Sequence, residues 1–219
     1  MTPHAKSLLP VLLLALAILL ASCGGSGGED AQGANQADKD KSGRMSGMKG
    51  MDHGSGGMAS GMLMKNGKYS DERFIDAMVP HHEGAVEMAR VAQKHAEHPE
   101  IQQLADNIIT TQRAEIKELE SIKQEEFGNS RVPKKTNMGQ MQNMGMMMNP
   151  GDLANKNPFD KAFVDNMIPH HRSAIEMAEV ALENTDNPKI KELATNIVEA
   201  QRREISQMNE WRERWYQGD

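Results

Sequence analysis

The sequence predicts an all-α protein, a four-helix bundle built from two tandem helical hairpins. Residues 74–119 recur as residues 163–208 at a constant offset of 89, with 22 identities in 46 aligned positions. An internal repeat of this kind is one structural unit used twice. Apolar residues recur at helical spacing in each repeat, and no segment sustains the alternation typical of a strand. Two hairpins that each expose an apolar face close most simply on each other.

The first hairpin is expected over residues 70–127. Its first helix begins at Ser70 or Asp71, either of which can cap it, and runs to about residue 97. His98 and Pro99 then break the chain, and Pro99 suits the first turn of the next helix. That second helix carries an apolar stripe of Ile101, Leu104, Ala105, Ile108, Ile116 and Leu119.

The second hairpin, over residues 158–217, repeats this plan. Asn187 and Pro188 form the break. The stripe that follows consists of Ile190, Leu193, Ala194, Ile197, Ile205 and Met208. The Met-rich linker between the hairpins, residues 128–157, is long for a bundle, so the sequence defines the helix count better than the relative orientation of the hairpins.

The amino-terminal segment predicts export. Residues 8–20 are apolar and follow Lys6, but they are fewer than the roughly 20 residues that a membrane span needs. This pattern is typical of a secretory signal. It ends in Leu-Ala-Ser before Cys23, which resembles the bacterial lipobox. We therefore expect cleavage after residue 22 and a lipid, palmitate among its chains, on Cys23. The alternative is an ordinary secretory signal.

Composition narrows the function classes. Cys23 is the only cysteine, so an intramolecular disulfide is excluded. The net charge is −6 and no arginine-rich run appears, which argues against a nucleic-acid partner. Residues 23–69 are rich in Gly, Ser, Asp, Lys and Met with few aliphatic residues. Such a segment cannot bury enough apolar surface to fold, and we expect a disordered tether between the membrane and the bundle.

The repeated motif, Pro-His-His with methionine on both sides, is the main candidate site. At 100° per residue these side chains share the inward sector of the first helix of each hairpin. Buried imidazoles need partners, and imidazole with thioether suits Cu(I) or Ag(I). The alternative is a structural role, with the methionines as core filler. The candidate ligands are Met78, His81, His82 and Met88, and in the second repeat Met167, His170, His171 and Met177.

Two carboxylates accompany the motif. Glu115 and Glu204 occupy equivalent positions on the apolar stripes of the second helices, next to Gln112 and Gln201. A carboxylate on a core stripe needs a partner, and the facing histidines are the obvious one. The glutamates either orient the imidazoles by hydrogen bonding or bind the metal themselves.

Both segments outside the helices carry clustered methionines in a chain with 18 methionines. Thioether sulfur prefers Cu(I) and needs no deprotonation. We therefore expect further copper binding there, the alternatives being low-complexity drift or adaptable partner binding. The candidate ligands are Met45, Met48, Met51 and His53 in the tether and Met138, Met141 and Met144 in the linker.

The Pro-His-His pattern, with its flanking Met and the later Gln-x-x-Glu-Ile stretch, resembles the family catalogued as domain of unknown function 305. The resemblance covers most of residues 70–217. It implies a ferritin-like helical bundle, and it implies periplasmic copper binding and copper tolerance, to which some Met- and His-rich members are linked. The site positions that carry over are the eight Met and His residues of the repeated motif.

The favoured function is a copper-binding lipoprotein of the bacterial cell envelope that sequesters Cu(I) or passes it to a copper-handling protein. It is not an enzyme in this interpretation. One alternative is a ferritin-like metal oxidase. Di-iron bundles use Glu-x-x-His motifs, which neither repeat contains. The other alternative is a metal-free interaction module of the envelope.

Overall fold

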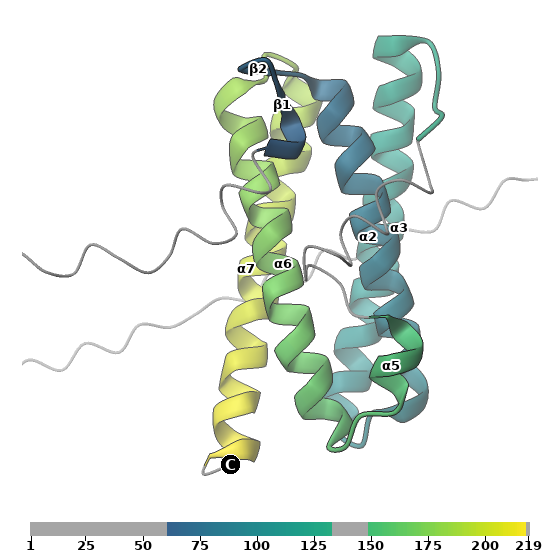
Figure 1. The fold of residues 1–219 in the computed structure, drawn as a ribbon, viewed down its shortest axis with the longest axis vertical. Helices are drawn as coiled ribbons and strands as arrows, with labels where there is room; N and C mark the ends of the chain where they lie inside the picture. Colours follow the sequence, from purple (N-terminus) through teal and green to yellow (C-terminus); the bar gives the residue numbers. More distant parts are fainter. Residues whose placement is uncertain (1–60, 133–148, 218–219) are drawn as a thin grey trace, which may run out of the picture. The chain divides into compact units, whose positions relative to one another are not determined.

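The computed structural model describes residues 61–132 and 149–217. Four long helices form a bundle: α2 (Asp71–His95), α3 (Pro99–Phe127), α6 (Phe159–Asn184) and α7 (Pro188–Tyr216). A short helix, α5 (Pro150–Ala154), and two short strands, β1 (Met64–Lys65) and β2 (Lys68–Tyr69), accompany them. The predicted all-α, ferritin-like bundle of two helical hairpins is confirmed (Figure 1).

Each hairpin packs along its length, α2 against α3 and α6 against α7. The two hairpins meet mainly through α2 and α6, and α3 approaches α7 less closely. Late residues of α2 share an apolar cluster with early residues of α6, so these two helices run antiparallel. The repeated motifs of α2 and α6 therefore face each other across the bundle.

Prolines set the helix boundaries as the sequence predicts. Pro99 and Pro188 each occupy the first turn of the helix that follows the break. The Asn187 side chain caps α7, because its Oδ1 accepts a 2.9 Å hydrogen bond from the backbone N–H of Lys189. The prolines of the repeated motif lie inside the continuous helices α2 and α6.

The apolar core is divided in two. One cluster contains the late part of α2 and the early part of α6, among them Met88, Phe163 and Met167. The other contains the early part of α2 and the late part of α6, including Met78 and Met177. Both histidine pairs lie between the two clusters, together with the core Gln and Glu residues of α3 and α7. We call this band of polar residues the histidine layer; all of its members are buried except the half-buried Glu204, and it consists of His81, His82, Gln112, Glu115, His170, His171, Ser173, Gln201 and Glu204.

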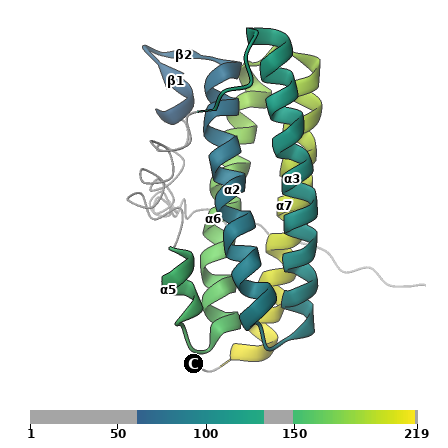
Figure 2. The same cartoon turned by 90° about the vertical axis from the view of Figure 1, so that its right-hand side faces the viewer.

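The last residues of the predicted disordered tether are ordered, which corrects the sequence analysis, and the last residues of the Met-rich linker are ordered too. Residues 61–63 are helical, and the strands β1 and β2 form a hairpin around Asn66 and Gly67, both of which have positive φ. At the end of the linker, Asn149 caps α5. Leu63 and Leu153 are fully buried and hold these pieces onto the bundle. The hairpin and α5 lie near its opposite ends (Figures 1 and 2).

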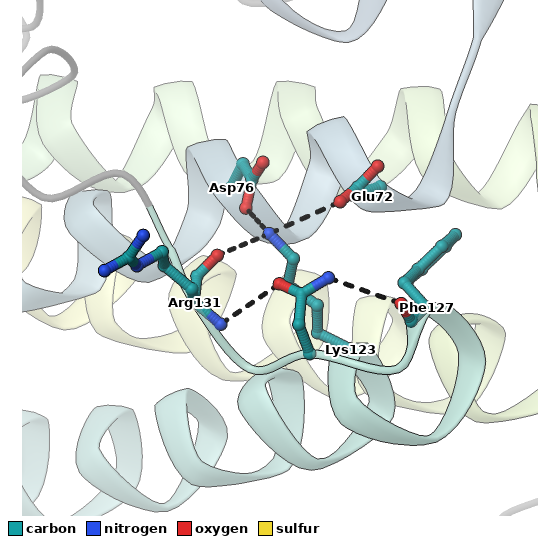
Figure 3. A network of polar contacts seen from close by, with 6 residues as sticks. Glu72, Asp76, Lys123, Phe127 and Arg131 are labelled. Carbon is teal, nitrogen blue, oxygen red and sulfur yellow. Dashed lines mark hydrogen bonds and ion pairs between the residues drawn. The ribbon is translucent and has the colours of Figure 1, made fainter.

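The segment after α3 is held by a buried lysine (Figure 3). Lys123 is only 2% exposed, and its Nζ contacts Asp76 of α2 and lies 3.6 Å from Glu72 Oε1. The same Nζ donates a 2.8 Å hydrogen bond to the backbone carbonyl of Arg131. This network ties the chain that leaves α3 to the start of α2.

Several predicted residues lie outside the described residues: the lipidation site Cys23 and the Met-rich candidates Met45, Met48, Met51, His53, Met138, Met141 and Met144. Their roles remain predictions. In the described part of the chain, none of the helices combines the length and the apolar character that a membrane crossing requires.

Candidate metal centre

The structure brings the two Pro-His-His motifs together in the middle of the bundle. All four of their histidines are fully buried. The rings of His81 and His170 lie 3.8 Å apart between centroids, at an interplanar angle of 37°. The ring centroids of His81 and His82 lie 6.2 Å apart, and those of His170 and His171 lie 6.3 Å apart. The antiparallel arrangement of α2 and α6 thus places His81 directly against its own repeat counterpart.

The glutamates of α3 and α7 flank the outer histidines. His171 Nε2 donates a 2.6 Å hydrogen bond to Glu204 Oε2. In the first repeat, His82 Nε2 lies 2.9 Å from Glu115 Oε2, but the ring is not aligned for a hydrogen bond. The expected pairing of histidine and glutamate is present in both repeats. A carboxylate that holds one ring nitrogen orients the other toward a metal, so this geometry favours the orienting role.

A residue that the sequence analysis did not single out joins the layer. Ser173 Oγ lies 2.7 Å from His81 Nε2, across the interface between α2 and α6. The same hydroxyl donates a 2.7 Å hydrogen bond to the backbone carbonyl of His170. The position is Gly84 in the first repeat. Gly84 and Ser173 are one of several differences between the two motifs, so the sequence alone gives no specific signal for Ser173.

The histidine layer contains several buried polar atoms without a hydrogen-bond partner among the described residues. Both ring nitrogens of His170 lack one, as do both side-chain amide atoms of Gln112 and of Gln201. Each of the other three histidines has an unpaired Nδ1. Buried polar atoms are normally paired, and unpaired ones indicate a missing water or ion. The clustering of so many in one layer is therefore evidence for a binding site.

Burial also keeps the central pair neutral. The pKa of His81 lies well below its usual value, chiefly because burial penalises the charged form, and the neighbouring His82 and His171 lower it further. The pKa of His170 is lowered for the same main reason. In each case the backbone of the opposite histidine raises the pKa of the ring, although the two make no well-aligned hydrogen bond. Neutral imidazole has the free lone pair that a metal requires.

The four candidate methionines flank the layer. Met88 and Met167 belong to the apolar cluster on one side, and Met78 and Met177 belong to the cluster on the other. All four are buried. Each side of the layer therefore has one thioether from each repeat, as an approximate two-fold axis predicts. Their role as ligands remains a prediction.

Within residues 61–132 and 149–217, no group of three or more His, Cys, Asp or Glu side chains is arranged to hold a metal ion. Cu(I) accepts few ligands and takes thioether sulfur readily. The layer offers imidazole, with buried methionines on both sides, and these are donor types that copper accepts.

The histidines at the end of α2 lie outside the layer. His95 is exposed. His98 is only partly exposed, because its Nδ1 lies 2.6 Å from Oδ2 of the buried Asp160 and its ring stacks on Trp215. Asp160 also accepts a 2.8 Å hydrogen bond from the backbone N–H of His98. These contacts fix the turn between α2 and α3.

The family model described as domain of unknown function (DUF305) matches residues 19–123 and 71–212. The chain belongs to this family. CopM in its Cu(II)-bound form is a similar solved structure, with 41% identity, a TM-score of 0.64 and coverage of 68% of this chain and 99% of CopM. CopM in its Cu(I)-bound form has 37% identity and a TM-score of 0.60 over the same shares of the two chains.

Two further relatives extend the comparison. A DUF305 fragment from Deinococcus radiodurans shares the fold at 24% identity and a TM-score of 0.58, over 66% of this DUF305 chain and 95% of the fragment. The uncharacterized protein L153 of Acanthamoeba polyphaga mimivirus is 46% identical over 50 residues, which are 23% of this chain. That match spans about a third (33%) of the mimivirus protein's length.

Proposed function

We propose that this protein binds copper as Cu(I), and Ag(I) by the same donor chemistry, and that the histidine layer holds the ion. The observation that carries the proposal is the layer itself: four fully buried imidazoles, each with at least one unpaired nitrogen, between two pairs of buried methionines. Leaving these nitrogens unpaired costs about 1–3 kcal/mol each in an apolar core. A bound ion would remove that cost.

The similarity to CopM supports the choice of metal. CopM has been solved in Cu(I)-, Cu(II)- and Ag-bound forms. Soft donors are common to copper(I) and silver, and the layer offers imidazole and thioether rather than clustered carboxylates. That donor set supports the proposed oxidation state, Cu(I).

The remaining parts of the chain suggest the biological setting. Lipid on Cys23 would hold the bundle at a membrane of the cell envelope, outside the cytoplasm. The Met-rich tether and linker would add weaker thioether sites. We propose that the protein sequesters copper there, or passes it to a copper-handling partner, and that it has no catalytic activity.

A Cu(I) competition titration of the full chain at neutral pH tests the proposal. Replacing His81, His82, His170 and His171 together by Ala should abolish the tightest Cu(I) equivalents. Replacing the six candidate tether and linker methionines by Leu should remove only weaker equivalents, which persist at acid pH because thioethers carry no proton.

The matched control is His95→Ala, which removes an exposed histidine outside the layer and should leave the titration unchanged. Circular dichroism should confirm that every variant remains helical. A folded tetra-His variant with full stoichiometry and affinity would show that the histidines are structural, and the proposed site would be wrong.

A further inference from the structure

The hydrogen bonds of Ser173 determine which nitrogen of His81 carries a proton. A serine hydroxyl has one hydrogen to donate. The backbone carbonyl of His170, 2.7 Å away, can only accept, so the hydroxyl donates to it. Toward His81 the same oxygen must then accept, and Nε2 of His81, also 2.7 Å away, must be the donor. His81 is therefore the Nε2–H tautomer.

The other ring nitrogen of His81 follows from this assignment. A neutral imidazole with its proton on Nε2 has a bare lone pair on Nδ1. That Nδ1 is buried and has no hydrogen-bond partner in the described part of the chain. His171 has the same arrangement, because Glu204 accepts from its Nε2 and its Nδ1 is unpaired. In metal sites, the hydrogen bond made by one ring nitrogen fixes the ring so that the other binds the ion.

The first repeat has no equivalent of this hydroxyl. Gly84 occupies the position of Ser173, and it cannot hold His170 as Ser173 holds His81. Both ring nitrogens of His170 are accordingly unpaired among the described residues. Gly84 is also a poor choice for a helix interior, where it costs about 1 kcal/mol relative to Ala. The two central histidines, 3.8 Å apart, are thus chemically different although the helices that carry them are repeats.

We propose that Ser173 is a positioning residue of the copper site, which holds His81 as the Nε2–H tautomer and makes Nδ1 the nitrogen that binds copper. His170, opposite Gly84, has no such hydroxyl to fix its tautomer. It enters the same site as a ligand without that constraint. The two motifs then form one asymmetric site rather than two equal ones. The choice of Nδ1 as the copper-binding nitrogen rests on the proposed copper-binding function. The tautomer of His81 does not, since it is a property of the metal-free protein.

The tautomer is measured first, by ¹H–¹⁵N NMR of the histidine rings in the metal-free full chain at neutral pH. His81 should show a proton on Nε2 and a bare Nδ1, and Ser173→Ala should abolish this preference. Ser173→Thr keeps the hydroxyl and should restore it. His170 should show no single preferred tautomer. The inference is overturned if His81 carries its proton on Nδ1, if Ser173→Ala leaves its tautomer unchanged, or if His170 is also fixed as Nε2–H.

Copper affinity is measured next, in the same variants. Losing a residue that orients a ligand typically weakens metal binding about 10-fold or more, so Ser173→Ala should weaken Cu(I) binding by about 10-fold and Ser173→Thr should recover most of it. Ser121→Ala, at an exposed serine on α3, is the matched control. If the tetra-His variant loses copper but Ser173→Ala binds as tightly as the wild type, this inference fails while the proposed function stands. If the tetra-His variant keeps its copper, the proposed function fails instead.

Discussion

Lys123 and Arg212 occupy the same position in the two repeats, 89 residues apart, yet their surroundings differ. Lys123 is 2% exposed and contacts Asp76 and the backbone of Arg131. The Arg212 side chain is 42% exposed, and its Nη1 lies 3.6 Å from the equivalent aspartate, Asp165. The charge pair is the same in both repeats. In the first repeat the chain that follows the hairpin turns back and covers the pair, because the Arg131 carbonyl accepts a hydrogen bond from Lys123 Nζ.

In the middle of the bundle, by contrast, equivalent residues of the two repeats have similar surroundings. Both repeats place a His-His pair, a Gln and a Glu at equivalent positions in the histidine layer, and burial is nearly the same for each. Ser173, in place of Gly84, adds a hydrogen bond to the layer in the second repeat. The comparison teaches that the repeats keep the same histidine, glutamine and glutamate positions at the centre, where Ser173 alone makes the two central histidines differ, while their ends have adapted to different connections.

The largest expected effect is the loss of stability when Lys123 is replaced, compared with the loss when its counterpart Arg212 is replaced. Lys123→Met keeps the apolar stem of the side chain and removes its charge, so Asp76 and the Arg131 carbonyl lose their donor. We expect a loss of about 2 kcal/mol in the free energy of unfolding, moderated because the Asp76 side chain is 24% exposed. Arg212→Met breaks an exposed pair and should cost less than about 1 kcal/mol. Urea denaturation of the two variants measures both values, and equal losses would contradict the difference between the ends.

The next prediction tests whether the two central histidines, His81 and His170, contribute equally to the pH dependence of stability. The pKa values of His81 and His170 are lowered by burial from an ordinary value of 6.5. Below that pH the unfolded chain binds protons at both positions while the folded chain does not, so stability should fall as the pH falls. Above pH 6.5 these two residues should contribute no pH dependence.

Denaturation of the metal-free protein at about pH 7.5 and about pH 5.5 measures this loss. His81→Gln and His170→Gln should each remove a similar share of the acid sensitivity, because the two positions are equally buried. Stability that is flat across this range, or that rises toward acid, would show that the central pair does not titrate as its burial requires.

The smallest effect concerns the helix ends. Gly128 ends α3 with φ 72°, in the left-handed region, whereas its counterpart Gln217 ends α7 with φ −68°. Gly128→Ala should destabilise the protein by about 1 kcal/mol, because a Cβ is strained in that conformation. Gln217→Ala is the matched control and should be neutral. A shift in thermal midpoint for both variants, or for neither, would count against this assignment of the cap.

The fold could be predicted from the sequence because its signals are local and repeated. Apolar spacing of the helical period and the prolines at 99 and 188 define four helices without any knowledge of the tertiary structure. Two ordered pieces were missed although they carry turn signals. Asn66-Gly67 is a strong hairpin signal, and Asn149-Pro150 is a cap followed by a proline in the first turn. Both pieces lie in segments rich in Gly and Met, and this composition led to the prediction of no ordered structure there.

The candidate site could be predicted only in part. Duplication and helical phase put each histidine pair on the inward face of its helix and indicate the core glutamates as partners, whereas the contact between His81 and His170 depends on how α2 and α6 pack. The roles of Ser173 and Lys123 depend on contacts between residues 92 and 47 positions apart. Serine and lysine are normally surface residues, so residue type gives no sign that these two are buried. Such contacts emerge only when the helices are packed together.

X-ray absorption of the Cu(I)-loaded full chain tests the central claim most directly, that the histidine layer binds copper. In this experiment Met45, Met48, Met51, Met138, Met141 and Met144 are replaced by Leu, so that sulfur from the candidate tether and linker ligands is removed. The account predicts copper with imidazole nitrogen among its nearest neighbours, joined by thioether sulfur, and no such signal once the four histidines of the layer are replaced by Ala. Copper surrounded by sulfur alone, or an unchanged spectrum in the tetra-His variant, would contradict it.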